Sequence, residues 1–320
     1  MPSVTASTPG RRNGARALVC VSALGCGLLS ACSVDKLAAR AFANALASSG
    51  DVYASDEDPE LVAEALPFAL KTMESLLVEL PEHQGLLLAS CSGFTQYAQA
   101  FVAEPADYLE AEDLEAARAE RERAARLFVR ARAYCLRAIA TEHPRLAEGL
   151  RAGSVGGLEQ TGVDDVPLLY WTGATWAAAI NVARSDLDLV ADLHVANALL
   201  ERALELDPDW QRGAIYDVLI AVEAARAPAS GGSLDEARSY YERALELSQG
   251  HRLGIHVTLA ESIAVKRQDY REFRRALERV LAFELSAAPD NRLANTLARR
   301  RARWLLQRSS DLFYAYEEDS

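Results

Sequence analysis

The feature that most constrains the fold is a hexapeptide, Glu-Arg-Ala-Leu-Glu-Leu, which occurs at positions 201–206 and again at 242–247. The two copies lie 41 positions apart, and a fainter third copy, Arg-Ala-Leu-Glu, occurs at 275–278. Self-similarity at such a period is typical of helical hairpins that stack, because each hairpin buries its open face only against the next one. The repeat therefore predicts stacked helical hairpins in the second half of the chain.

The spacing within each copy indicates the kind of hairpin. A tetratricopeptide repeat has small, large, small and proline positions in its second helix. These are Ala196, Leu200, Ala203 and Pro208, and the first three recur at Ala237, Tyr241 and Ala244. The first-helix positions match poorly, so a generic helical bundle stays the alternative. Ala, Leu, Arg and Glu dominate elsewhere and strand signals are almost absent, which predicts an all-α, tetratricopeptide-like fold.

Helix-capping and helix-breaking residues indicate where the helices of the first half begin and end. Asp58-Pro59 provides an N-cap followed by proline at the first helical position. The helix that starts there is predicted to run to Pro81, with further helices at about 82–103 and 112–141. A glycine-rich loop at 153–162 then divides the chain roughly in half.

The N-terminus has the pattern of a bacterial lipoprotein signal. Arginines precede an apolar run at 17–29, and Ser30-Ala31 places small residues before Cys32, the predicted lipid attachment site. The run is too short for a membrane-spanning helix, which needs about 20 apolar residues. An ordinary cleaved signal or an uncleaved anchor are the alternatives. The predicted organisation is a signal peptide at 1–31, a lipidated tether with a short helix at 32–57, and a single helical domain at 58–320.

The residue after the acylated cysteine bears on localisation. In Gram-negative lipoproteins an Asp at this position commonly directs retention in the inner membrane, whereas this chain has Ser33. We therefore expect a protein that is lipid-anchored in the cell envelope, in the outer membrane and facing the periplasm.

Charge excludes some partners. Removal of residues 1–31 takes away three arginines and no acid, which leaves 31 basic and 46 acidic residues. An acidic protein is a poor ligand for nucleic acid or for an anionic membrane surface. The basic run at 299–303 is interpreted as the solvated side of a helix, with a neighbouring acidic element as a possible partner. Two cysteines are left beyond Cys32, namely Cys91 and Cys135, and each has apolar neighbours. We expect free buried thiols, and a disulfide formed in an oxidising periplasm is the alternative.

Two predicted helices, at 85–97 and 168–180, carry no charged residue. A helix that is apolar all round must be surrounded by protein. Both mix large aromatic residues with small ones, which either admit a close neighbouring helix or leave room for a ligand beside an aromatic wall. The packing interpretation is the simpler one. The ligand hypothesis names Phe94, Tyr97, Tyr170, Trp171, Gly173 and Trp176.

Catalytic and metal-binding patterns are missing from the sequence. The five histidines are scattered, and none has a metal-ligand partner at helical spacing. No nucleophile elbow or phosphate-binding glycine loop occurs. We therefore expect no catalytic residue, no bound metal and no cofactor. The protein is predicted not to be an enzyme.

Several ordered segments together resemble one family, the lipoprotein T component of TRAP transporters, called TatT. They are Asp58-Pro59-Glu60-Leu61, Gly93-Phe94-Thr95-Gln96-Tyr97, Asp165-Val166-Pro167 before Tyr170-Trp171, and Asn291-Arg292-Leu293-Ala294-Asn295 before Arg301-Ala302-Arg303-Trp304-Leu305-Leu306. Each segment alone is weak evidence for the family. The resemblance rests on the order of the segments along the chain together with the lipoprotein signal.

The resemblance implies an all-helical protein with tetratricopeptide-like hairpins, assembled as a homotrimer whose subunits each carry a pore or cleft. Its partner would be the substrate-binding P component of a TRAP transporter, to which it would pass a small hydrophobic or carboxylated ligand. The alternative is a structural outer-membrane scaffold for envelope proteins that holds no small molecule.

Overall fold

The computed structural model describes residues 1–3, 5 and 38–314, and it divides the chain into two units, residues 1–45 and 46–320. In the first unit, residues 38–45 are helical. The predicted signal peptide and Cys32 lie outside the described residues. Within the described ranges, no helix is both long enough and apolar enough to cross a membrane.

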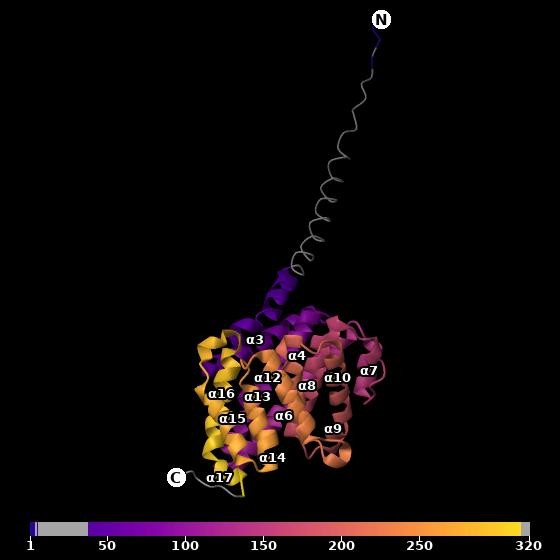
Figure 1. Ribbon diagram of the computed structural model, residues 1–320. Coiled ribbons are helices and arrows are strands. Elements are labelled where there is room, and N and C mark those ends of the chain that lie inside the picture. Colours follow the sequence, from indigo (N-terminus) through magenta and orange to yellow (C-terminus); the bar gives the residue numbers. More distant parts are fainter. Residues whose placement is uncertain (4, 6–37, 315–320) are drawn as a thin grey trace. The chain divides into compact units, whose positions relative to one another are not determined.

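The second unit is all-α, as predicted, and the residues described there contain no β-strand (Figure 1). Its α-helices are α2 (Gly50–Ala54), α3 (Pro59–Glu79), α4 (Gln84–Ala98), α5 (Glu104–Leu109), α6 (Leu114–Ala140), α7 (Pro144–Arg151), α8 (Val166–Val182), α9 (Leu187–Ala191), α10 (Leu193–Leu206), α11 (Ala214–Ala225), α12 (Leu234–Ser248), α13 (Gly254–Thr258), α14 (Val265–Arg267), α15 (Tyr270–Ala282), α16 (Arg292–Gln307) and α17 (Ser309–Leu312). Two π-helical segments, η1 (Gln99–Ala103) and η6 (Leu259–Ala264), join α4 to α5 and α13 to α14.

Side-chain caps set the helix starts where the sequence predicted them. The Asp58 carboxylate accepts a hydrogen bond of 3.0 Å from the Leu61 amide at the start of α3. Asp113 does the same for Ala116 at the start of α6, with a distance of 2.9 Å. Each cap satisfies a donor that the first helical turn leaves unpaired.

Helix α8 runs through the middle of the second unit. It packs against α4, α6 and α10, and Figure 1 shows α8 and α10 side by side. Eleven of its residues are buried, including Trp176, which is 2 % exposed. The expectation that an uncharged helix must be surrounded by protein is confirmed here.

Each copy of the repeated segment lies on a helix that packs against an earlier one. The first two copies lie in the last turns of α10 and α12. Helix α10 packs against the earlier helix α8, and α12 packs against α11, which precedes it. The third copy lies in the middle of α15, which packs against η6. The small positions Ala203 and Ala244 are fully buried. Such pairing is what helical hairpins require, and the finer tetratricopeptide assignment stays a prediction.

A partly buried charge cluster ties α5, η6 and α16 together. Arg301 on α16 donates to the Glu261 carboxylate at 2.9 Å and lies 3.0 Å from an Asp107 oxygen. Its guanidinium also lies 4.3 Å from the Trp304 ring centre, a cation–π distance. The solvated side predicted for 299–303 is therefore wrong for Arg301, whose side chain is only 13 % exposed, whereas its acidic neighbours are present as anticipated.

Candidate functional site

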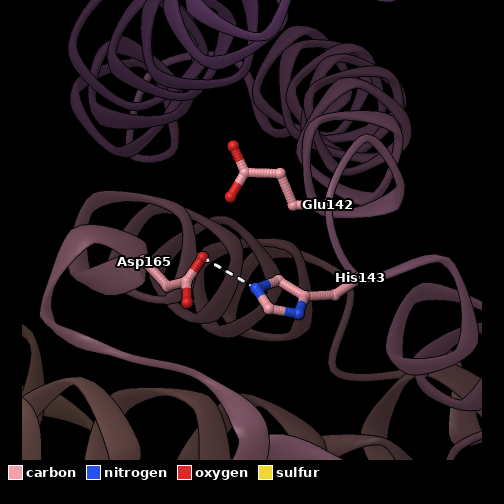
Figure 2. A group of neighbouring side chains, drawn as sticks. All are labelled: Glu142, His143 and Asp165. Carbon is pink, nitrogen blue, oxygen red and sulfur yellow. Dashed lines mark hydrogen bonds and ion pairs between the residues drawn. The ribbon is translucent and has the colours of Figure 1, made fainter.

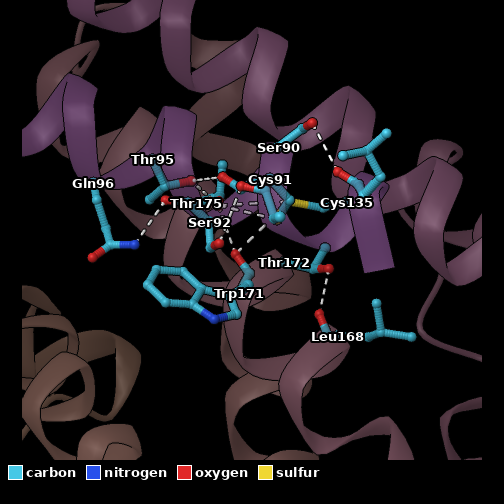
Figure 3. The surroundings of a disulfide bond; sticks show 12 residues. Ser90, Cys91, Ser92, Thr95, Gln96, Cys135, Leu168, Trp171, Thr172 and Thr175 are labelled. Atoms are coloured by element: carbon cyan, nitrogen blue, oxygen red, sulfur yellow. Dashed lines mark hydrogen bonds between the residues drawn. A yellow bond between two sulfur atoms is a disulfide. The ribbon is translucent and has the colours of Figure 1, made fainter. Parts of the chain in front are cut away.

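The two uncharged helices, α4 and α8, pack against each other and against α6. The hydroxyl oxygens of Thr95 and Thr175 lie 2.6 Å apart across the α4–α8 contact. Cys91 and Cys135 form a disulfide between α4 and α6, and the Thr175 hydroxyl lies 3.6 Å from the Cys135 sulfur (Figure 3). The expectation of free thiols is therefore wrong. Packing of α4 on α6 brings the two Cα atoms to 5.0 Å, a separation that a disulfide spans.

Three of the predicted ligand-binding aromatics face α6. The Phe94 ring stacks on Tyr134 at 5.8 Å, and the Tyr97 hydroxyl accepts a hydrogen bond of 3.3 Å from Arg123. Trp176 lies under the Arg132 guanidinium at 4.6 Å. Each ring has its own protein partner, and the ligand role assigned to these side chains stays a prediction.

Gly173 lies at the contact between α8 and α10. A Cβ at this position would lie 2.8 Å from Leu200 Cγ and 3.1 Å from the Ala196 carbonyl oxygen. Its small size admits the neighbouring helix, so the space beside it is filled by Leu200.

Tyr170 and Trp171 belong to an aromatic corner at the start of α8. The Tyr170 ring centre lies 5.0 Å from that of Trp171 and 4.6 Å from that of Trp210. Burial raises the pKa of Tyr170 to about 12. Directly after Trp210 come Gln211 and Arg212, both with positive φ (44° and 54°), a conformation that costs L-residues free energy and that clusters at functional sites.

The loop between α12 and α13, residues 249–253, connects this corner to a cleft. Arg252 donates to Asp217 at 2.7 Å and to the Gln211 carbonyl at 3.4 Å. On the other side, the buried Asn295 accepts from the Leu253 amide at 3.0 Å and donates to the His251 carbonyl at 3.0 Å. The loop is therefore held from both sides, which fixes the residues that it contributes to the cleft.

The cleft has a volume of about 370 Å³, within the range of small-molecule sites. Its lining combines apolar side chains with a few polar groups. The lining residues are Leu245, Gln249, Gly250, Leu253, His256, Arg279 and Phe283.

Its polar groups form a short chain. The Tyr241 hydroxyl lies 2.9 Å from His256 Nδ1. Burial raises the pKa of the Tyr241 phenol, and the charge of Arg279 together with a hydrogen bond from it opposes that shift. Burial, with a smaller contribution from the Arg279 charge, lowers the pKa of His256 to about 4, so this imidazole is neutral at pH 7.

A separate group, Glu142, His143 and Asp165, brings three possible metal-ligand atoms within 4.8 Å of one another (Figure 2). His143 Nε2 lies 2.9 Å from one Asp165 oxygen, and the other accepts from the Gly162 amide at 2.8 Å. These bonds tie the start of α7 to the start of α8 and account for the arrangement of His143 and Asp165. Sequence spacing missed the group because its partners are 22 positions apart.

Comparison with known proteins identifies the family. Residues 55–313 match the family model described as TRAP transporter T-component. The chain is also 32 % identical over 313 residues to a protein of Treponema pallidum (strain Nichols), with 92 % of this chain and 97 % of that protein covered. That relative is described only as an uncharacterized protein. The chain belongs to the TRAP transporter T-component family. As a T-component, it is an accessory part of a transport system, in a family that is not catalytic.

Two of the T-component segments quoted from the sequence lie at the aromatic corner and at the cleft. Tyr170 and Trp171 form the aromatic corner, and Asn295 holds the loop that lines the cleft. Tyr241, His256 and Arg279 were missed by sequence reasoning. The repeat spacing marks Tyr241 only as a helix-packing position, and the three side chains come from α12, α13 and α15 and meet only in the folded chain.

Proposed function

We propose that this T-component is a periplasmic lipoprotein that binds the substrate-binding P component of its TRAP transporter and handles the transported ligand by binding, not by catalysis. The observation that carries the proposal is the family match across residues 55–313, nearly the whole described body. A cleft of small-molecule size in that body supports a ligand-handling role over a purely mechanical one.

Anchoring through Cys32 is part of the proposal. Acylation would give the protein a multi-chain anchor, which holds a protein on a membrane better than one chain does. Replacing Cys32 with Ser should move the protein from the membrane fraction to the soluble fraction and leave its helical circular dichroism unchanged. Retention of the Cys32→Ser protein in the membrane fraction would contradict the anchor.

Association with the P component is the central test. The full-length protein should bind the P component encoded with it saturably, and it should not bind a P component from an unrelated TRAP system, which is the matched control. Native mass spectrometry of each species gives the stoichiometry of the complex, tests the proposed homotrimer and detects any small molecule that co-purifies. Absence of saturable binding to the cognate P component would overturn the proposal.

The stacked hairpins favour one alternative, a scaffold for envelope proteins that holds no small ligand. It predicts ligand-free protein in native mass spectrometry and no discrimination between the two P components. The same two measurements therefore decide between the proposals.

A further inference from the structure

The junction between α6 and α7 brings one imidazole and two carboxylates together. Glu142 and His143 lie between these two helices, and Asp165 lies directly before α8. One ligand atom from each of the three side chains lies within 4.8 Å of the other two (Figure 2). An imidazole nitrogen and carboxylate oxygens are ligands that divalent metal ions take in proteins.

The two carboxylates have no arginine or lysine partner. Within the described residues, the one ion pair of Asp165 is with His143, and the Glu142 side chain makes neither a hydrogen bond nor an ion pair. The Asp165 side chain is only 10 % exposed. A carboxylate buried to that degree is normally paired with a cation, and a neutral imidazole carries no charge. A divalent cation would balance the two negative charges.

Existing hydrogen bonds hold two of the ligand atoms close to the positions that a metal requires. His143 Nε2 lies 2.9 Å from Asp165 Oδ1, and the Gly162 amide donates to Asp165 Oδ2 at 2.8 Å, which fixes the carboxylate. Two ligand atoms on a tetrahedral zinc ion lie about 3.3 Å apart, so zinc in place of the shared proton requires only a small shift. The Glu142 side chain is exposed and can rotate to supply the third ligand.

The ligand set favours zinc over the common hard cations. Calcium takes about six to eight oxygen ligands, and magnesium requires octahedral coordination by oxygen. This group offers two carboxylates and one imidazole. Zinc binds both ligand types in tetrahedral geometry, and a water molecule can fill a position that the protein does not supply.

The three ligands flank the glycine-rich loop at 152–162. Gly153 and Gly157 in this loop have positive φ values of 74° and 100°. A loop with several glycines loses much conformational entropy when it is ordered. An ion that binds only the folded arrangement of the flanking residues would offset part of that cost, because binding to the folded state alone stabilises it.

We propose that Glu142, His143 and Asp165 bind one Zn²⁺ ion, which clamps the junction of α6 and α7 onto the start of α8. The protein ligands are His143 Nε2 and one oxygen of each carboxylate, with water in the remaining position. The ion has a structural role. It requires neither the cleft nor binding of the P component, because the three ligands share no residue with the cleft.

Isothermal titration calorimetry with zinc chloride tests the site. The sample is the full-length protein without a histidine tag, after its free thiols have been alkylated with iodoacetamide so that they do not bind zinc. The native protein should bind one Zn²⁺ per chain and should bind Ca²⁺ at least about tenfold more weakly. Its thermal unfolding midpoint should rise when zinc is added.

Glu142→Gln is the decisive variant, because it removes a ligand and no hydrogen bond within the described residues. It should weaken zinc binding by at least about tenfold, since even changes to residues behind the ligands cost about 10- to 100-fold. Glu148→Gln is the matched control. It removes the same charge from an exposed position on α7 that makes no ion pair within the described residues, and it should not change zinc binding.

Three results would each overturn the zinc site. They are absence of saturable zinc binding, equal binding of zinc and calcium, and a Glu142→Gln variant that binds zinc as tightly as the Glu148→Gln control. His143→Gln should also lose zinc binding. Because His143 holds Asp165 in the folded protein, that variant counts only if its helical circular dichroism is native, and the two glutamate variants decide otherwise.

Discussion

Replacing Gly173 with Ala should destabilise the protein, although alanine is the better helix former. The substitution gains about 1 kcal/mol of helix propensity. Against this, the new methyl group would lie 2.8 Å from Leu200 Cγ, the branch point of a fully buried side chain, and 3.1 Å from the Ala196 carbonyl oxygen. Overpacking of a core typically costs about 1–3 kcal/mol. We expect the free energy of unfolding to fall by about 1–2 kcal/mol.

A matched control separates packing from propensity. At Gly149 in α7 the nearest atom to a new Cβ is the Ser154 carbonyl oxygen at 3.6 Å, an ordinary contact. Gly149→Ala should therefore stabilise the protein by about 0.5–1 kcal/mol.

A double-mutant cycle with Leu200→Ala locates the clash. Leu200→Ala alone should cost about 2–5 kcal/mol, and in that background Gly173→Ala should become nearly neutral, giving a coupling energy of at least about 1 kcal/mol. Urea unfolding followed by far-UV circular dichroism, with the disulfide kept oxidised, measures all four proteins. Stabilisation by Gly173→Ala equal to that of Gly149→Ala, or an additive cycle, would refute the packing role of Gly173.

Three further predictions concern the disulfide, the cleft histidine and a helix end. Replacing Cys91 and Cys135 by Ala should lower the free energy of unfolding by about 4 kcal/mol, because their bridge closes a loop with a sequence separation of 44; equal urea midpoints for native and variant proteins would contradict this. In the unfolded chain His256 has its ordinary pKa of about 6.5, whereas burial lowers its pKa in the folded chain to about 4. As the pH falls from about 6.5 to about 4, only the unfolded chain gains this proton. The free energy of unfolding should therefore fall by up to roughly 3 kcal/mol across that window. Urea titrations of native and His256→Gln proteins at several pH values check it, and parallel stability curves would argue against a buried neutral imidazole. Gln249 follows the end of α12 with φ 53°, a conformation that glycine adopts without strain, so Gln249→Gly should stabilise the protein by about 1 kcal/mol. Gln268→Gly should stabilise it less, because it removes hydrogen bonds from the Gln268 side chain to the Val265 and Leu312 carbonyls. Thermal unfolding of the two variants compares these effects.

The fold was largely predictable because its signals are local. Asp58 caps the helix that it was expected to cap, and the uncharged segment at 168–180 is buried as its composition requires. Helix caps and hydrophobic spacing act over a few residues, so their effect is present in the sequence before any tertiary contact forms. The family resemblance was equally accessible, since it rests on ordered strings spread along the whole chain.

The candidate site was accessible only in part. Sequence reasoning selected aromatic residues near α8, and the structure gives each a protein neighbour, from Tyr134 beside Phe94 to Arg132 over Trp176. The cleft residues His256 and Arg279 carry no distinguishing neighbours in the sequence.

The sequence by itself determined the all-α class, the starts of several helices and the family, because helix caps, short-range propensities and periodic apolar faces specify them. Only the tertiary structure decided that Cys91 meets Cys135, that Arg301 lies half-buried between two carboxylates, and that α12, α13 and α15 line a cleft. Those outcomes depend on which helix faces pack together. Contacts between residues tens of positions apart follow from the packing of whole helices, which no local pattern records.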